Sequence, residues 1–216
     1  MTASFSERLR ESAGADWRAA TAHRFVAELA DGSLAPECFR KYLTQDYAFI
    51  ETLVTMVGFA VARADGMAAK KRLAGFLGVL TSDENDYFRR AFDAVGVGPE
   101  ERSRPALSPV TAALRALMLE AGEAGTYADV LSAVVPAEWV YLTWGLARAE
   151  ARPPQPHYRE WIELHSTPAF ADFVAWLRAE LDRQAEALPA PERQRIEERF
   201  RRVVRLEVEF FDQAYA

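Results

Sequence analysis

Helical periodicity runs through nearly every long segment of the chain, and this feature constrains the fold more than any other. Apolar residues recur at intervals of three and four, whereas no segment shows the strict alternation of a half-buried strand. The sequence therefore predicts an all-α fold. Helices are expected from 36 to a break at 65–66, from there to a loop at 96–109, and over 109–121, 127–149, 158–165, 168–188 and 191–216.

The length of the chain and the place of its proline-rich segment predict a single domain over residues 1–216. A chain of 216 residues is long enough to bury a full core and short enough to form one compact unit. The proline-rich segment 151–156 is interpreted as a linker between helices. No internal repeat or low-complexity tract divides the sequence.

Charge and composition narrow the classes of partner. The formal net charge is −6, so the sequence lacks the excess of positive charge that is typical of nucleic-acid-binding proteins. Cys38 is the one cysteine, so no intramolecular disulfide can form, which fits a reducing compartment. Residues 1–14 lack the apolar core of a signal peptide, and the apolar run at 53–61 is shorter than the roughly 20 residues of a membrane span. A cytoplasmic protein is expected.

Acidic residues interrupt four of the apolar stripes. Asp46 shares a helix face with Tyr42 and Phe49, because residues three and four apart lie on one side of a helix. The same spacing places three glutamates among apolar neighbours on later helices. These are Glu84, Glu138 and Glu207.

Several inward-facing acids are informative because burial of an unpaired carboxylate is unfavourable by several kcal/mol. Burial raises the pKa of such acids toward values useful in acid–base chemistry. Each acid taken alone could instead cap a neighbouring helix or pair with an arginine. Together the four favour a shared polar cavity.

His165 lies on the same face as Trp161 and Ile162 and is a further candidate for that cavity. The alternative is a core histidine whose hydrogen bonds are satisfied internally. His23 and His157 are interpreted as helix-end or surface residues without a role.

Four inward-facing acids could in principle form a di-iron site. Such bundles use Glu-x-x-His pairs, in which a histidine follows a ligand acid by three residues. No histidine occupies these positions, and the sequence predicts neither a metal nor another cofactor. The residues found there are Phe49, Tyr87, Tyr141 and Phe210.

Three segments resemble the TenA/thiaminase II family. Residues 39–49 are similar to its Y-x-x-Q-D-x-x-[YF] helix, residues 134–141 to L-P-C-x-W-x-Y, and residues 207–215 to E-x-x-F-W-D-x-A-Y. The order and spacing of all three make the resemblance specific, and it spans nearly the whole chain. It implies a haem-oxygenase-like helical bundle and a homotetramer.

The resemblance also implies roles for individual residues. Asp46 would hydrogen-bond an aminopyrimidine ring, and Phe49 would stack on it. Tyr141 would orient the polar groups of the pocket. Glu207 would be the general acid/base. Independently of the resemblance, helical spacing places Glu84 and His165 inward, and both are expected to contribute to the substrate pocket.

Departures from the family pattern shape the functional expectation. Ala137 stands where the family has its nucleophilic cysteine, and Glu138 follows it, as in the cysteine-less branch. His165 falls where the family often has tyrosine. The sequence thus predicts a hydrolase in thiamine pyrimidine salvage that acts on aminomethyl- or formylaminomethyl-pyrimidine. Without a thiol, Glu207 and Glu138 would activate water together.

Two other classes of function remain open from the sequence. One is an oxidative enzyme on the same scaffold, either cofactorless or iron-dependent, since a fold alone does not determine chemistry. The other is a non-catalytic pyrimidine-binding or regulatory protein, in which the acids only shape a ligand pocket.

Overall fold

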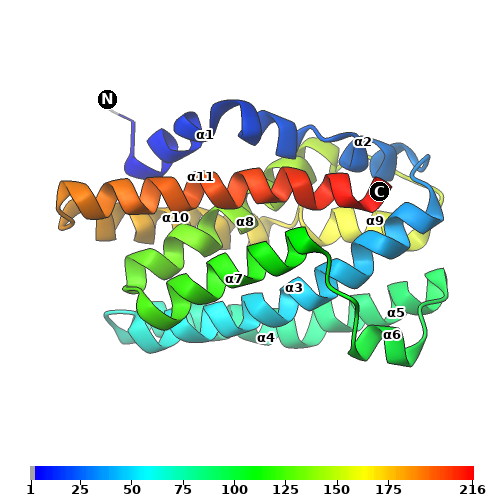
Figure 1. Ribbon diagram of the computed structural model, residues 1–216, viewed down its shortest axis with the longest axis horizontal. Coiled ribbons are helices and arrows are strands. Elements are labelled where there is room, and N and C mark those ends of the chain that lie inside the picture. Colours follow the sequence, from blue (N-terminus) through cyan, green and yellow to red (C-terminus); the bar gives the residue numbers. More distant parts are fainter. Residues whose placement is uncertain (1–2) are drawn as a thin grey trace.

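The computed structural model describes residues 3–216, and this part of the chain is built from helices and contains no strand (Figure 1). The expected all-α class is confirmed. The elements are, in chain order, α1 (Phe5–Thr21), α2 (Arg24–Asp31), α3 (Pro36–Arg63), α4 (Met67–Val79), η1 (Leu80–Glu84), α5 (Asn85–Val95), α6 (Pro99–Ser103), α7 (Pro109–Ala124), α8 (Tyr127–Arg148), α9 (Pro156–Leu164), α10 (Pro168–Glu186), α11 (Ala190–Asp212) and η2 (Gln213–Tyr215).

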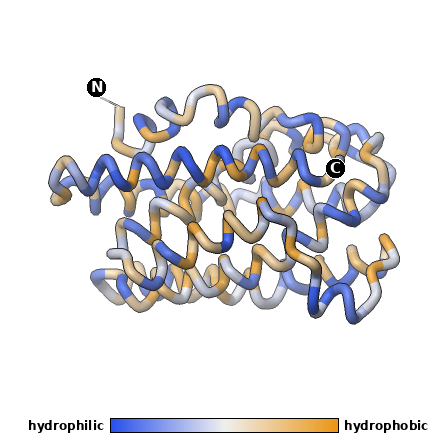
Figure 2. Tube along the Cα trace, viewed as in Figure 1, coloured by the Kyte–Doolittle hydropathy of each residue, from blue (hydrophilic) through white to orange (hydrophobic). Residues whose placement is uncertain are grey.

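Helix α8 forms the centre of the bundle. It packs against α3, α7, α10 and α11, and every residue from Tyr127 to Gly145 except Thr143 is buried. In Figure 1, α11 runs along the long axis of the molecule with α1 beside it, and α3 and α4 form the opposite side. Figure 2 shows hydrophilic residues alternating with apolar ones along α11. Since α8 and α11 pack against each other, the two helices that carry Glu138 and Glu207 are direct neighbours.

The helices begin where the local sequence supplies caps. Ser108, Thr126 and Thr167 each accept a hydrogen bond from a backbone N–H in the first turn that follows. These side chains satisfy donors that the helix itself leaves free. At the start of α8 the cap is reciprocal, because Asp129 accepts from the backbone N–H of Thr126 in return.

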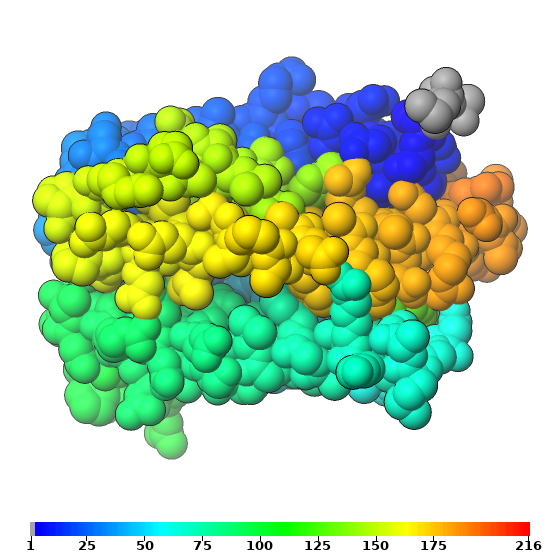
Figure 3. Space-filling model, turned by 180° about the vertical axis from the view of Figure 1, so that it is seen from behind, coloured from blue at the N-terminus to red at the C-terminus, as the bar shows by residue number. Residues whose placement is uncertain are grey.

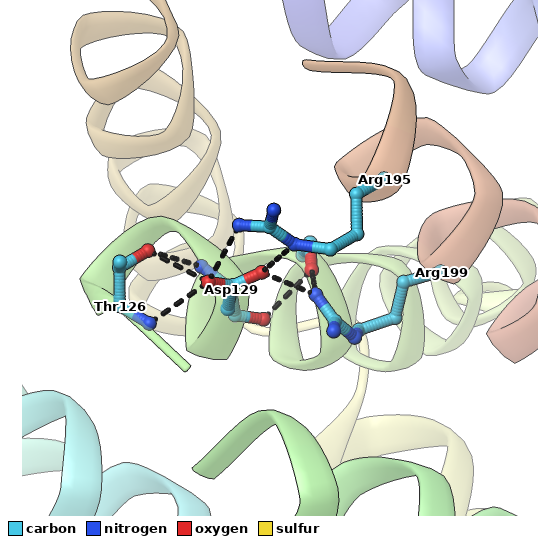
Figure 4. Close-up of polar contacts among 5 residues, drawn as sticks. Thr126, Asp129, Arg195 and Arg199 are labelled. Carbon is cyan, nitrogen blue, oxygen red and sulfur yellow. Dashed lines mark hydrogen bonds and ion pairs between the residues drawn. The ribbon is translucent and has the colours of Figure 1, made fainter. Parts of the chain in front are cut away.

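The start of α8 is also tied to α11 by an ion-pair network around Asp129 (Figure 4). Its Oδ1 lies 3.0 Å from Nε of Arg195 and 2.7 Å from Nη1 of Arg199. Although burial opposes it, these contacts and the bonds from Thr126 hold the pKa of Asp129 well below its usual range. The network joins the two helices that hold Glu138 and Glu207.

The segment from 67 to 95 differs from the single regular helix that the stripe predicted. A π-helical turn, η1, separates α4 from α5. A π turn adds one residue to the helix without ending it, so the apolar spacing on either side still looks helical. The expected loop at 96–109 likewise contains the short helix α6, which starts at Pro99.

The most apolar helix is α8 and not the region of 53–61. Its length and composition pass the test for a membrane-spanning segment, with a mean hydropathy of 1.3. However, 83% of that apolar window is buried inside the protein. The core helix of a folded bundle has these same properties.

Candidate active site

A cavity of about 390 Å³ lies between α3 and α8 on one side and the α4–η1 and α9–α10 segments on the other. A volume of this size is typical of sites for small ligands. Figure 3 shows a hollow between the yellow-to-orange α9–α10 side and the cyan-to-green α4–α5 side. The cavity is lined by both polar and apolar residues, and no lysine or arginine is among them. The polar members are Asp46, Asp83, Glu84, Glu138, Tyr141, His165 and Thr167.

Six of the seven predicted site residues line this cavity. Helix α3 contributes Asp46 and Phe49, which share one face with Ile50 and Leu53. Helix α8 contributes Glu138 and Tyr141. The remaining two, Glu84 and His165, come from the opposite wall.

The seventh, Glu207, is not among the lining residues. It is 1% exposed, and within residues 3–216 its Oε1 has no hydrogen-bond partner. Its charge contributes to the raised pKa of Glu138. Glu207 is thus buried on α11, which packs against the helix that carries Glu138.

Burial raises the pKa of all four acids. The pKa of Asp46 rises to about 7, mainly by burial and against the effect of the Tyr42 hydroxyl. The pKa of Glu138 rises to about 8, first by burial and then by the charges of Glu207 and Asp46. For Glu84 and Glu207 the pKa lies well above the ordinary value, again because of burial. Groups of this kind can exchange protons near neutral pH.

His165 has a fixed tautomer. Its Nδ1 lies 2.8 Å from the carbonyl oxygen of Trp161, which can only accept, so Nδ1 carries the proton. Burial lowers the pKa of His165 to about 4, so the ring is neutral and Nε2 is an acceptor. Gly145 permits this placement, since a Cβ there would collide with the backbone carbonyl of His165. The histidine is hydrogen-bonded internally and also lines the cavity.

The cavity contains no thiol. Ala137 lines it beside Glu138, at the position where the resemblance expected the missing cysteine. Cys38 is half-buried on α3 and is not among the lining residues. Within residues 3–216, no group of three or more His, Cys, Asp or Glu side chains is arranged to hold a metal ion.

The sequence did not reveal the aromatic mouth of the cavity. Phe76 of α4 and Phe173 of α10 stack across it, with ring centroids 4.0 Å apart. Trp161 and Phe170 extend the same wall. These residues have the spacing of ordinary core positions, so periodicity alone could not assign them to a site. Asp83, next to Glu84, was also missed because it lies off the stripe.

Known proteins resemble the chain over most of its length. An aminopyrimidine aminohydrolase from Halalkalibacterium halodurans is 29% identical over 214 residues, which cover 98% of this chain and 96% of the relative. A crystal structure from Silicibacter sp. TM1040, described as a TenA family transcription regulator, superposes with a TM-score of 0.86 at 26% identity, covering 96% of this chain and 95% of that one.

The comparisons also name the fold. A Shewanella denitrificans domain described as having a heme oxygenase-like fold superposes with a TM-score of 0.70 at 14% identity, covering 97% of this chain and 91% of the domain. The sequence model of the family described as TENA/THI-4/PQQC matches residues 11–216. The bundle therefore has the haem-oxygenase-like fold, and the chain belongs to the TENA/THI-4/PQQC family.

Proposed function

We propose that the protein is an aminopyrimidine hydrolase of thiamine pyrimidine salvage that works without a cysteine nucleophile. The substrate is 4-amino-5-aminomethyl-2-methylpyrimidine or its N-formyl derivative. The relative from Halalkalibacterium halodurans, named as an aminopyrimidine aminohydrolase, supports this reaction class. The observation that carries the proposal is a ligand-sized cavity in which Asp46, Glu84 and Glu138 meet without a thiol.

Residues of α3 and α8, which form the inner wall of the cavity, bind the pyrimidine ring. Asp46 accepts hydrogen bonds from the exocyclic amine, since its Oδ2 has no partner among residues 3–216. Phe49 stacks on the ring face. Tyr141 orients these groups, and its hydroxyl is itself held 2.9 Å from that of Tyr42.

Glu138 and Glu207 together activate water. Two nearby carboxyl groups repel each other's charge, so one stays protonated while the other ionises. The ionised member takes a proton from water as the oxygen attacks the methylene carbon. The C–N bond of the ammonium arm breaks, the leaving ammonia takes a proton from the protonated member, and hydroxymethylpyrimidine and ammonium are released. Glu138 lines the cavity, whereas Glu207 is buried on the adjacent helix α11.

The N-formyl derivative would follow a different bond cleavage at the same site. Water attacks the formyl carbon, the amide C–N bond breaks, and the products are formate and aminomethylpyrimidine. The same pair of carboxyl groups moves the protons. Substrate preference therefore depends on how the protein binds the arm of the pyrimidine, which is its aminomethyl or formylaminomethyl substituent.

The proposal includes an assembly and a location. The family resemblance implies a homotetramer, and the cysteine content fits the cytoplasm. Size-exclusion chromatography with light scattering tests the assembly, for which a tetramer mass near four times 24.2 kDa is expected.

The direct test is a chromatographic assay of purified, chelator-treated protein with the aminomethyl compound, the formylaminomethyl compound and thiamine. Release of hydroxymethyl- or aminomethyl-pyrimidine supports the proposal. Tight binding with recovery of unchanged ligand would instead favour a binding or regulatory protein, as would fit the description of the Silicibacter structure. Turnover that requires added iron would favour oxidative chemistry.

A further inference from the structure

Glu84 reaches the cavity from an element outside the three segments that resemble the family motifs. It is the last residue of the π-helical turn η1, and both it and Asp83 line the cavity. In a regular α-helix consecutive residues point about 100° apart. A π turn shifts the register by one residue, and such turns are frequent at functional sites.

The carboxyl of Glu84 lacks a protein partner. Glu84 is half-buried, and within residues 3–216 it is in no hydrogen bond or salt bridge. Its loss of solvent raises its pKa well above the ordinary value, and the charges of Glu138 and Asp46 raise it further. These two acids lie on the inner wall, on α8 and α3, so Glu84 faces them from the side of the mouth. No arginine or lysine lines the space between them.

A cavity with these groups lacks positive charge. Asp46 is 2% exposed, lines the cavity and keeps Oδ2 without a partner. Nε2 of His165 adds another acceptor. Buried carboxylates need a counter-charge or they remain protonated. A ligand with a positive charge and several N–H donors would supply the counter-charge and the hydrogen-bond donors that the cavity lacks.

The two possible substrates differ in this respect. An aminomethyl arm is an alkylammonium at neutral pH, with a positive charge and three N–H donors. A formylated arm is neutral, offers one N–H and brings a carbonyl oxygen, which is repelled by carboxylates. Charge-assisted hydrogen bonds are about twice as strong as neutral ones.

We propose that Glu84 is the specificity-determining residue that supplies the counter-charge for the ammonium arm and so selects the aminomethyl over the formylaminomethyl pyrimidine. This inference rests on the proposed function. It extends that function, because it names the preferred substrate and assigns the preference to a residue on η1.

The test compares wild type with Glu84→Gln on both compounds. For the aminomethyl substrate, kcat/KM is expected to fall about 10- to 100-fold, mainly through a higher KM. For the formyl substrate it is expected to change less than about threefold. The matched control is Asp86→Asn, two residues along on α5, whose side chain is 59% exposed and lies 3.8 Å from Arg89. It should leave both substrates unaffected.

Binding separates this inference from the proposed function. Calorimetric Kd values for both compounds do not depend on turnover, so they test the selection even if wild type hydrolyses neither. A selective loss of affinity for the amine in Glu84→Gln supports the inference. Equal losses for both compounds, no loss, or no binding of the amine to wild type would overturn it. A melting temperature for Glu84→Gln at or above wild type shows that the fold is intact.

Discussion

The hydroxyl groups of Tyr42 and Tyr141 lie 2.9 Å apart in the buried core and join α3 to α8. Tyr141 lines the cavity, whereas Tyr42 is not among the lining residues. Asp46 follows Tyr42 by one turn, and the Tyr42 hydroxyl lowers its pKa against the effect of burial. The bond between the tyrosines therefore links the packing of the bundle to the polar groups of the site.

This geometry predicts a difference between two conservative variants. Tyr42→Phe and Tyr141→Phe remove the same hydrogen bond, so each should lower the free energy of unfolding by about 1 kcal/mol. The double variant should lose less than the sum of the two, as measured in urea unfolding. Tyr141→Phe should reduce kcat/KM about tenfold, and Tyr42→Phe should reduce it less. Additive stability changes would contradict the shared bond.

The Asp129 network should be a major contribution to stability. Replacement of Asp129 by alanine leaves two arginines without their buried partner, which destabilises a protein by about 3–5 kcal/mol. For a chain of this size, that corresponds to a decrease of roughly 10 °C in melting temperature. The control is Arg205→Ala, which removes an ion pair whose arginine is 71% exposed. It should change stability by less than about 1 kcal/mol. Similar effects of the two variants would contradict the assignment.

The stability of the ligand-free protein should decrease as the pH rises from about 5 to 8. With raised pKa values of about 7 for Asp46 and about 8 for Glu138, the native state holds protons that the unfolded chain has released. Asp129 has a lowered pKa, so its contribution is instead lost in acid, below about pH 4. His165, whose pKa is lowered to about 4, acts in the opposite direction below about pH 6.5, but the four acids with raised pKa values outnumber it. The melting temperature should therefore be highest near about pH 5.

Glu138→Gln checks the origin of this pH dependence. The variant should flatten the decrease between about pH 5 and 8, because it removes one of the groups that titrates there. Glu150→Gln is the control, since that side chain is 99% exposed. A melting temperature that rises toward pH 8 in wild type would contradict the burial of unpaired acids.

Activity should not depend on a thiol. Cys38→Ser is expected to retain turnover within about twofold of wild type, and iodoacetamide should not inactivate the enzyme. The reason is that Cys38 is not among the cavity-lining residues and Ala137 occupies the position of the expected nucleophile. Loss of turnover on alkylation of wild type, with retention in Cys38→Ser, would show that a modified Cys38 blocks the site.

The helical bundle and most of the inner wall could be predicted from the sequence. Asp46 and Glu138 interrupt apolar stripes at helical spacing, and each faces the cavity as the pattern indicated. Glu207 shows the limit of this reasoning. A helical wheel places it inward, but it cannot distinguish a side chain that lines a cavity from one packed beside the wall.

The outer wall of the cavity, on the side of α4, η1, α9 and α10, could not be predicted for a different reason. Phe76 and Phe173 contact each other from helices that are far apart in sequence, and their spacing is that of any core residue. The π turn at Leu80–Glu84 changes the register by a single residue, which apolar periodicity does not reveal. Long-range pairing and one-residue shifts depend on tertiary packing.

The proposed mechanism assigns hydrolysis of an aminopyrimidine to two buried glutamates and requires no thiol. The most direct measurement is turnover of 4-amino-5-aminomethyl-2-methylpyrimidine by wild type and Glu207→Gln, followed chromatographically. Wild type should release the hydroxymethyl product, and the variant should lose at least about 100-fold in kcat, a typical effect of removing an acid–base group, with an unchanged or higher melting temperature. Turnover by Glu207→Gln at the wild-type rate would contradict the account.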